Sequence, residues 1–153
     1  MDITAALDAP TAPTVLLPHV EALDRYPAWM PLAHRVVADG VDTEGRPAWQ
    51  VELRARLGPF ARSKRLRMVR TVHDVEHCLV RFERAELDGR AHSPWVLDAT
   101  IETIETDQPG DACRLTMRLH YGGALWTGGV MERVLADQIV AGRERLLVLV
   151  SEG

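Results

Sequence analysis

Apolar and polar residues alternate along most of the chain between residues 34 and 121, with the two-residue period of strands that bury one face. In the clearest stretch, apolar side chains from Val51 to Leu57 alternate with Glu52, Arg54 and Arg56. Glycine, proline and aspartate separate this stretch from its neighbours. The pattern predicts seven strands, over residues 3–7, 34–39, 49–57, 63–72, 77–87, 95–106 and 113–121.

A helical period replaces this alternation in the last quarter of the chain. Six apolar or small residues recur there at steps of three or four: Met131, Leu135, Ile139, Gly142, Leu146 and Val150. That spacing places them on one face of a long C-terminal helix. Residues 14–23 predict one or two short helices broken near Pro18, and residues 24–31 predict a turn because Pro27 and Pro31 disfavour a regular helix.

The order of these elements indicates how the layers pack. Strands with one apolar face must cover that face, and the long C-terminal helix is the largest apolar partner in the sequence. A first strand, two short helices, six further strands and a long helix give an α+β fold, with a curved antiparallel sheet around the helix, in one domain over residues 1–153. A sheet and helix packed in this way can enclose a cavity, which favours a small apolar ligand.

Three segments add a family resemblance to this order of elements. They are the turn Tyr26-Pro27-Ala28-Trp29, the strand Phe82-Glu83-Arg84 followed by Leu87-Asp88-Gly89-Arg90 and Trp95, and Tyr121-Gly122-Gly123 before the last helix. With them, the chain resembles the START-like superfamily over essentially its whole length. This superfamily is also called the helix-grip, polyketide cyclase/dehydrase-like or SRPBCC fold. The resemblance implies a deep cavity that takes sterols, lipids, polyketides, quinones or hormones.

Nine residues fall on the inward strand face, at its ends or on the helix stripe, and we expect several of them to line one cavity. They are Trp49, Met68, Phe82, Leu97, Met117, Tyr121, Trp126, Met131 and Leu135. Tyr121 is expected to supply the hydrogen-bonding group, because a buried phenol needs a partner. The glycines around Trp126 make that segment the expected gate of the cavity. Trp49, Trp95 and Trp126 lie near element ends, where they could rim a cavity or equally fill a core.

Three functions remain open at this stage. The first is binding of a hydrophobic small molecule such as a lipid, polyketide or quinone, without a cofactor. The second is a polyketide aromatase or cyclase, which needs inward acid or base groups. The inward polar residues are Tyr121, Thr103, Arg62, Lys64 and Gln138, and they include no carboxylate–histidine pair. The third is an interaction module whose pocket is filled by its own side chains.

Charge argues against a nucleic-acid partner, because the 153 residues carry a net charge of −4. One basic stretch, from Arg54 to Arg70, nevertheless holds seven basic residues and no acid. Most of these side chains alternate away from the apolar face, so we interpret them as an outer charge ladder with acids on neighbouring strands. Arg62 and Lys64 are the exceptions, since their parity places them inward near the cavity mouth.

Other motifs give no further site. His73-Asp74-Val75-Glu76-His77 matches an inverted zinc-peptidase motif, but it falls where two strands join, so we predict a polar hairpin and no metal. The glycines at 122–123 and 128–129 lack the lysine and hydroxyl of a phosphate loop. Cys78 and Cys113 lie in strand patterns and are expected to be reduced, buried thiols. With no basic leader and no apolar run of about 20 residues, we expect a cytoplasmic protein without stable membrane insertion.

Overall fold

The computed structural model describes residues 2–57, 59–122 and 130–152. Its described strands form one antiparallel seven-stranded sheet in the order β1-β7-β6-β5-β4-β3-β2. The strands are β1 (Asp2–Ala9), β2 (Ala33–Val41), β3 (Pro47–Leu57), β4 (Phe60–Asp74), β5 (Leu79–Arg84), β6 (Trp95–Thr103) and β7 (Cys113–Tyr121). The helices are α1 (Pro13–Val20), the 3₁₀ helix η1 (Leu23–Ala28) and α2 (Val130–Glu152).

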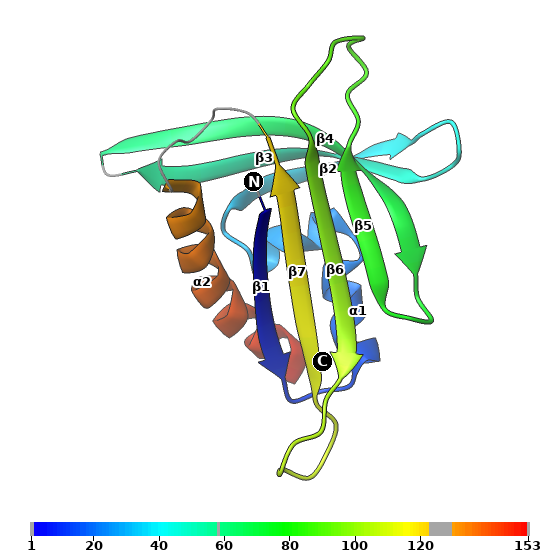
Figure 1. Cartoon of the computed structure of the whole chain (residues 1–153), viewed down its shortest axis with the longest axis vertical. Coiled ribbons are helices and arrows are strands. Elements are labelled where there is room, and N and C mark those ends of the chain that lie inside the picture. Colours follow the sequence, from blue (N-terminus) through cyan, green and yellow to red (C-terminus); the bar gives the residue numbers. More distant parts are fainter. Residues whose placement is uncertain (1, 58, 123–129, 153) are drawn as a thin grey trace.

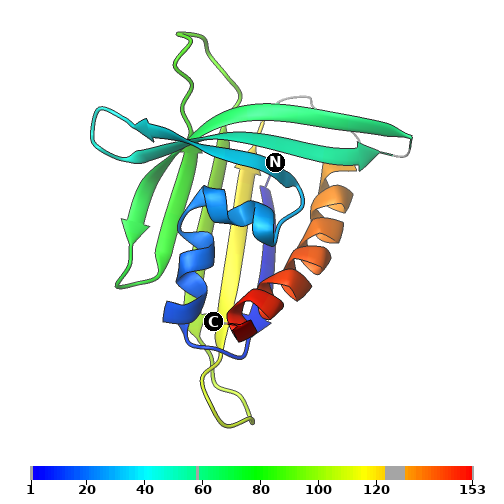
Figure 2. The ribbon, with the colours of Figure 1, turned by 180° about the vertical axis from the view of Figure 1, so that it is seen from behind.

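The sheet is strongly curved. In Figure 1, β2, β3 and the first part of β4 run across the direction of β1, β7 and β6. Figure 2 shows α1, η1 and α2 together on the concave side. The predicted α+β fold is therefore confirmed, including the curved antiparallel sheet, the two short helical segments after the first strand and the long C-terminal helix. None of the described helices is long and apolar enough to span a membrane.

The segment expected to be a turn, residues 24–31, contains most of η1 instead. A 3₁₀ helix tolerates Pro27 there because the bonds around it are donated by other residues. Arg25 N donates to Ala22 O at 3.1 Å, while Trp29 N and Met30 N donate to Tyr26 O at 3.0 and 2.7 Å. The prolines exclude a longer α-helix, as expected, but still allow one short helical segment.

An aromatic cluster joins η1 to the sheet. The Tyr26 ring centroid lies 4.9 Å from that of Trp29 and 6.2 Å from that of Phe82, and Phe82 lies 5.7 Å from Trp49. The Tyr26 hydroxyl donates to Val20 O at 2.9 Å, and Trp29 Nε1 donates to His19 O at 3.0 Å. These bonds satisfy two buried donors and fix η1 against α1. Burial raises the pKa of Tyr26, so its phenol stays neutral.

The buried Gly142 brings α2 into close contact with Trp29. A Cβ placed on Gly142 would lie 2.9 Å from the Trp29 carbonyl oxygen and 3.5 Å from its ring. The sequence suggests a close approach to the sheet or a kink as the reason for a glycine here. The contact is instead with the residue that follows η1. A side chain at 142 would therefore push the helix away from the aromatic cluster.

We expect Gly142→Ala to destabilise the protein by about 1 kcal/mol. The alanine improves helix propensity by about 1 kcal/mol, but overpacking against Trp29 costs about 1–3 kcal/mol. Urea unfolding followed by tryptophan fluorescence measures the difference. Ala141→Gly is the control and should lose only the propensity contribution. A Gly142→Ala protein more stable than the wild type would contradict the close contact.

The outer face differs from the predicted arginine ladder. Arg54, Arg56 and Arg65 are exposed, and the ion pairs found among the described residues do not include them. The pairs between adjacent strands are Arg81–Asp98 at 2.6 Å and Arg114–Asp8 at 2.7 Å, and His120 contacts Asp2 at 2.8 Å. Arg67 was expected in the same ladder, yet it is only 4% exposed. Its guanidinium donates to Asp39 and to Ala85 O, which approach it from either side of β4.

The two cysteines lie in different settings. Cys113 is buried in β7, and burial raises the pKa of its thiol. Cys78 is half-buried, and the prediction that it lies in a strand is wrong: it closes the turn after β4 and has a left-handed φ of 50°. Both are free thiols.

Candidate ligand-binding site

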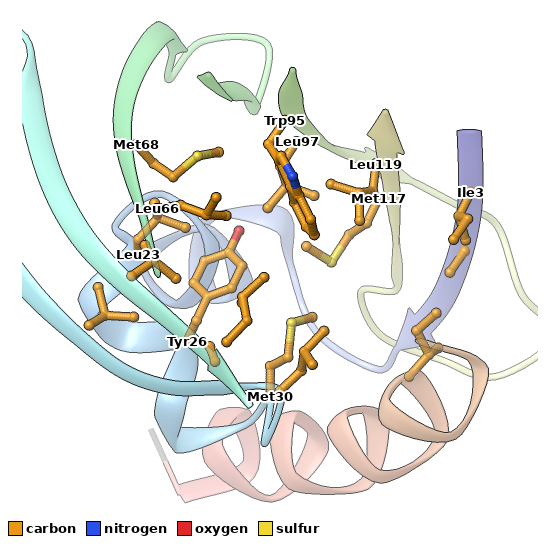
Figure 3. A pocket seen from close by; sticks show the side chains of 17 residues that line it. Ile3, Leu23, Tyr26, Met30, Leu66, Met68, Trp95, Leu97, Met117 and Leu119 are labelled. Carbon is orange, nitrogen blue, oxygen red and sulfur yellow. The ribbon is translucent and has the colours of Figure 1, made fainter. Parts of the chain in front are cut away.

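A cavity of about 100 Å³ lies between the concave face of the sheet and the helical segments. Figure 3 shows the described side chains that line it. They come from both layers of the fold: Ile3 and Ala5; Leu23, Tyr26, Met30 and Leu32; Ala33, Val36, Val51, Leu53, Leu66 and Met68; and Trp95, Leu97, Met117, Leu119 and Ile139. None of these residues carries a formal charge.

Strand parity explains how the sheet contributes to this wall. Val51 pairs with Leu66, and Trp49 pairs with Met68, across the β3–β4 ladder. Leu97 pairs with Leu119 across β6 and β7, so inward residues of adjacent strands lie side by side. Opposite them, η1 and the loop after it present Tyr26 and Met30, and α2 presents Ile139.

Only two side chains of the described wall carry a polar group. The Tyr26 hydroxyl already donates to Val20 O. Trp95 is 4% exposed, and its Nε1 has no hydrogen-bond partner among the described residues. The indole packs against Tyr121, with ring centroids 5.3 Å apart. The wall therefore offers hydrophobic contact and one unpaired N–H donor.

A second, smaller cavity of about 20 Å³ adjoins the first. Both are lined by Ala5, Met30, Met117 and Ile139, so these side chains separate them. Methionine side chains are unbranched and adapt to irregular space. Met30 and Met117 are therefore the most adaptable side chains of the wall that the two cavities share.

The structure brings together part of the predicted set. Met68, Leu97 and Met117 line the cavity. Trp49, Phe82 and Tyr121 are buried but do not line it: Trp49 and Phe82 pack on each other, and Tyr121 packs on Trp95. Trp126, and the gate predicted around it, lie outside the described residues, as do the side chains of Met131 and Leu135.

Sequence reasoning missed the contribution of η1 and the loop that follows it. Leu23, Tyr26, Met30 and Leu32 supply one side of the cavity, whereas the sequence pattern marked most of this segment as a turn. A signal was present, because an aromatic residue and three large apolar residues in a proline-rich turn need a buried surface to contact. Trp95 was considered as a rim residue, and it lies in the wall itself.

The other predicted polar candidates lie apart from the cavity wall. Arg62 is exposed and Lys64 is half-buried beside it, paired with Ala55 and Leu53 across the hairpin. Burial, followed by the charge of Arg84, lowers the pKa of Lys64. Thr103 is exposed, and Gln138 is half-buried on α2 with an unpaired Oε1. None of the four lines the cavity.

The inverted zinc-peptidase motif does not form a metal site. His73 bonds to Glu21 at 2.9 Å, while His77 bonds to Asp74 at 2.7 Å. The two histidines thus have different carboxylate partners. Across residues 2–57, 59–122 and 130–152, no cluster of three or more His, Cys, Asp or Glu side chains could hold a metal ion.

A larger hollow of about 230 Å³ lies on the outer side of β2, β3 and β4. It is lined by Arg35, Gln50, Glu52 and Arg65 together with Val37 and Val51. The exposed Arg35 and Arg65, together with the half-buried Glu52, make this a solvated groove. The cavity of about 100 Å³ between the sheet and the helical segments is the better candidate, because its wall is apolar and is formed by both layers of the fold.

Searches with the sequence against protein-family models and curated proteins gave no match. Solved structures do match. A START superfamily protein from Mycobacterium smegmatis superposes with a TM-score of 0.67 at 13% identity, over 99% of this chain and 97% of that one. TTHA0849 from Thermus thermophilus gives 0.64 at 16% identity, over 99% and 95%. Ara h 8.0201 gives 0.60 at 11% identity, over 100% and 99%.

These likenesses extend over nearly the whole of each chain, and they share the arrangement of sheet and helices described above. The protein therefore has the START-like, helix-grip fold. At this level of sequence identity the likeness establishes the fold, while the ligand has to be argued from the cavity itself.

Proposed function

We propose that this protein binds a hydrophobic small molecule in the cavity between the sheet and the helical layer. The observation that supports the proposal is the composition of the described wall, which combines aliphatic, methionine and aromatic side chains with no charged group. Burying apolar ligand surface against such a wall contributes about 25 cal/mol per Å². The START-like fold is compatible with this function, because proteins of this fold include hydrophobic-ligand binders.

The cavity volume sets the size of the group it can hold. Drug-sized ligands occupy pockets of roughly 300–1,000 Å³, whereas an apolar cavity of about 150 Å³ holds benzene. At about 100 Å³, the present cavity suits a short branched chain as it stands, and a single ring once an adaptable wall side chain such as Met117 shifts. The adjoining cavity adds only about 20 Å³, so a larger lipid, polyketide or quinone requires the sheet and the helical layer to move apart.

The described wall gives an acid–base reaction little support. A cyclase needs a group that accepts or donates a proton within hydrogen-bond reach of its substrate. No carboxylate, imidazole or amine lines the described wall, and burial raises the pKa of Tyr26. We therefore propose binding rather than catalysis. The cytoplasmic location and the single domain remain sequence-based predictions.

The test is a titration with two neutral probes. Toluene and ethylbenzene, each with a single ring, are titrated into ¹⁵N-labelled protein, and the shifts of the amide signals of the cavity wall are followed by NMR. We expect both to bind the wild type. Met117→Trp places an indole in the cavity and should abolish binding of both probes. Phe82 was also predicted to line the cavity, but a tryptophan at that position would not fill it, because Phe82 is not part of the wall.

Arg118→Trp is the matched control, because it adds the same side chain to the exposed face of the same strand. It should leave binding unchanged. If the wild type binds neither probe, or if Met117→Trp binds as well as the wild type, the cavity is not a binding site. A module filled by its own side chains would then be the better account.

A further inference from the structure

The unpaired donor on Trp95 distinguishes this cavity from a purely hydrophobic one. An indole N–H buried without a partner costs about 1–3 kcal/mol relative to a paired one. Buried tryptophans therefore usually find an acceptor. Trp29 follows this rule, since its Nε1 donates to His19 O at 3.0 Å. Trp95 is similarly buried, at 4% exposure, and the described part of the chain supplies no such acceptor.

The position of Trp95 indicates where an acceptor would come from. Three other buried polar atoms in the described chain also have no partner: Arg70 Nε, Thr71 Oγ1 and Gln138 Oε1. Their residues do not line the cavity, whereas Trp95 does. In Figure 3 the Trp95 indole projects from the start of β6 into the space between Leu66 and Met68 on one side and Met117 and Leu119 on the other.

The rest of the wall restricts what kind of acceptor can bind. An ionised carboxylate or phosphate loses its hydration in an apolar cavity and needs a cation to compensate. The described wall has none. A carbonyl or ether oxygen carries no such cost, and it can accept one hydrogen bond while the rest of its molecule contacts the aliphatic side chains.

We propose that the ligand is a neutral molecule with a carbonyl-type oxygen, and that Trp95 Nε1 donates a hydrogen bond to that oxygen. This inference rests on the proposed binding function and adds the chemical class of the ligand. The nitrogen is covered by neighbouring atoms, with almost no accessible surface. The oxygen therefore reaches it only when an adaptable side chain of the wall, such as Met117, rotates aside.

Acetophenone and ethylbenzene test this assignment, because they have nearly the same shape and differ by a carbonyl in place of a methylene. Both are titrated into ¹⁵N-labelled wild-type protein, and the indole N–H signals are followed by NMR. We expect acetophenone to bind about five- to tenfold more tightly. It should move the Trp95 indole proton downfield, whereas ethylbenzene at equal occupancy should not. Benzoate, with the same ring and a charge, should bind more weakly than either.

Substitution gives a second, independent readout. Trp95→Phe keeps an aromatic ring but removes the donor, so it should weaken acetophenone about five- to tenfold and change ethylbenzene by less than about twofold. Trp49→Phe is the matched control, because Trp49 is also buried but does not line the cavity. It should affect the two probes equally.

The outcomes separate the inference from the proposed function. If both probes bind with equal affinity, or the Trp95 indole signal does not distinguish them, the hydrogen bond is absent and the ligand class is wrong while the cavity still binds. Tighter binding of benzoate than of acetophenone would overturn the neutral class. If neither neutral probe binds the wild type, both the binding function and the inference are wrong.

Discussion

Replacing Arg67 with alanine is expected to destabilise the protein by about 1–3 kcal/mol, more than the loss of any exposed arginine on the same face. Arg67 is 4% exposed, and its Nε donates to Asp39 at 3.0 Å while an Nη donates to Ala85 O at 2.9 Å. Removing the guanidinium leaves the Ala85 carbonyl without its donor, while Asp39, whose side chain is 38% exposed, keeps Gln50 as a donor. It also removes the packed stem of a long side chain.

Arg65→Ala is the matched control, since Arg65 is exposed on the same face of the same strand. It should change the free energy of unfolding by less than about 0.5 kcal/mol. Both are measured by urea unfolding near neutral pH. Equal effects of the two substitutions would mean that Arg67 acts as another solvated arginine, as the sequence pattern suggested.

The pH dependence of the free energy of unfolding tests whether Asp39 is the partner through which Arg67 stabilises the protein. Hydrogen bonds from Gln50 and then Arg67 lower the pKa of Asp39 below its ordinary value of 3.8. A lowered carboxyl pKa contributes stability above the unfolded-state pKa, and this contribution is lost as the pH falls through the folded-state pKa. The difference between wild type and Arg67→Ala should therefore narrow below about pH 4. If the stability difference between wild type and Arg67→Ala stays constant with pH, the contribution of Arg67 comes from its hydrogen bond to Ala85 O and from packing.

The burial of Arg67 shows what alternation can and cannot predict. Strand parity correctly separates Leu66 and Met68 from Arg65 and Arg67, because side chains alternate between the two faces of a sheet. It cannot say how deeply each face is covered. Asp39 comes from β2, and Ala85 and Glu86 follow β5, so the groups that cover Arg67 are 18 to 28 residues away in the sequence.

The cavity wall illustrates the same distinction. Met68, Leu97 and Met117 could be expected from parity alone, and they line the cavity. Phe82 has the same parity but is fully buried against Tyr26 and Trp49. Which inward residues face empty space and which face the core depends on where η1 packs. A local sequence pattern does not contain that information.

The prolines around η1 explain why its part in the cavity was difficult to foresee. Pro27 and Pro31 exclude a regular α-helix, and the segment was therefore interpreted as a connection. Because η1 still forms, it places Tyr26 over Phe82 and turns Met30 toward the cavity. The proline-containing segment thus contributes side chains to the hydrophobic core and to the cavity wall. Trp29, the residue that follows η1, contacts Gly142 of α2.

Shortening Leu146 to alanine is expected to cost about 3 kcal/mol, the second large effect, because Leu146 is the fully buried large side chain among the described residues of α2. Leu146 is completely buried, and α2 contacts β1 and α1. Removing a buried leucine side chain loses its transfer free energy and leaves a cavity, at about 2–5 kcal/mol in total. Leu146 lies seven residues beyond Ile139, which is the described residue of α2 in the cavity wall.

Val148→Ala is the control, because Val148 lies on the same helix and is 54% exposed. It should cost less than about 0.5 kcal/mol when both variants are compared with the wild type by thermal or urea unfolding.

The complete removal of residues from Met131 onward should have a still larger effect than Leu146→Ala. The concave face would lose its long helix, and the product should be insoluble or unfolded. A Leu146→Ala protein as stable as Val148→Ala, or a truncated chain that unfolds cooperatively, would show that the sheet and the short helices hold the fold without α2.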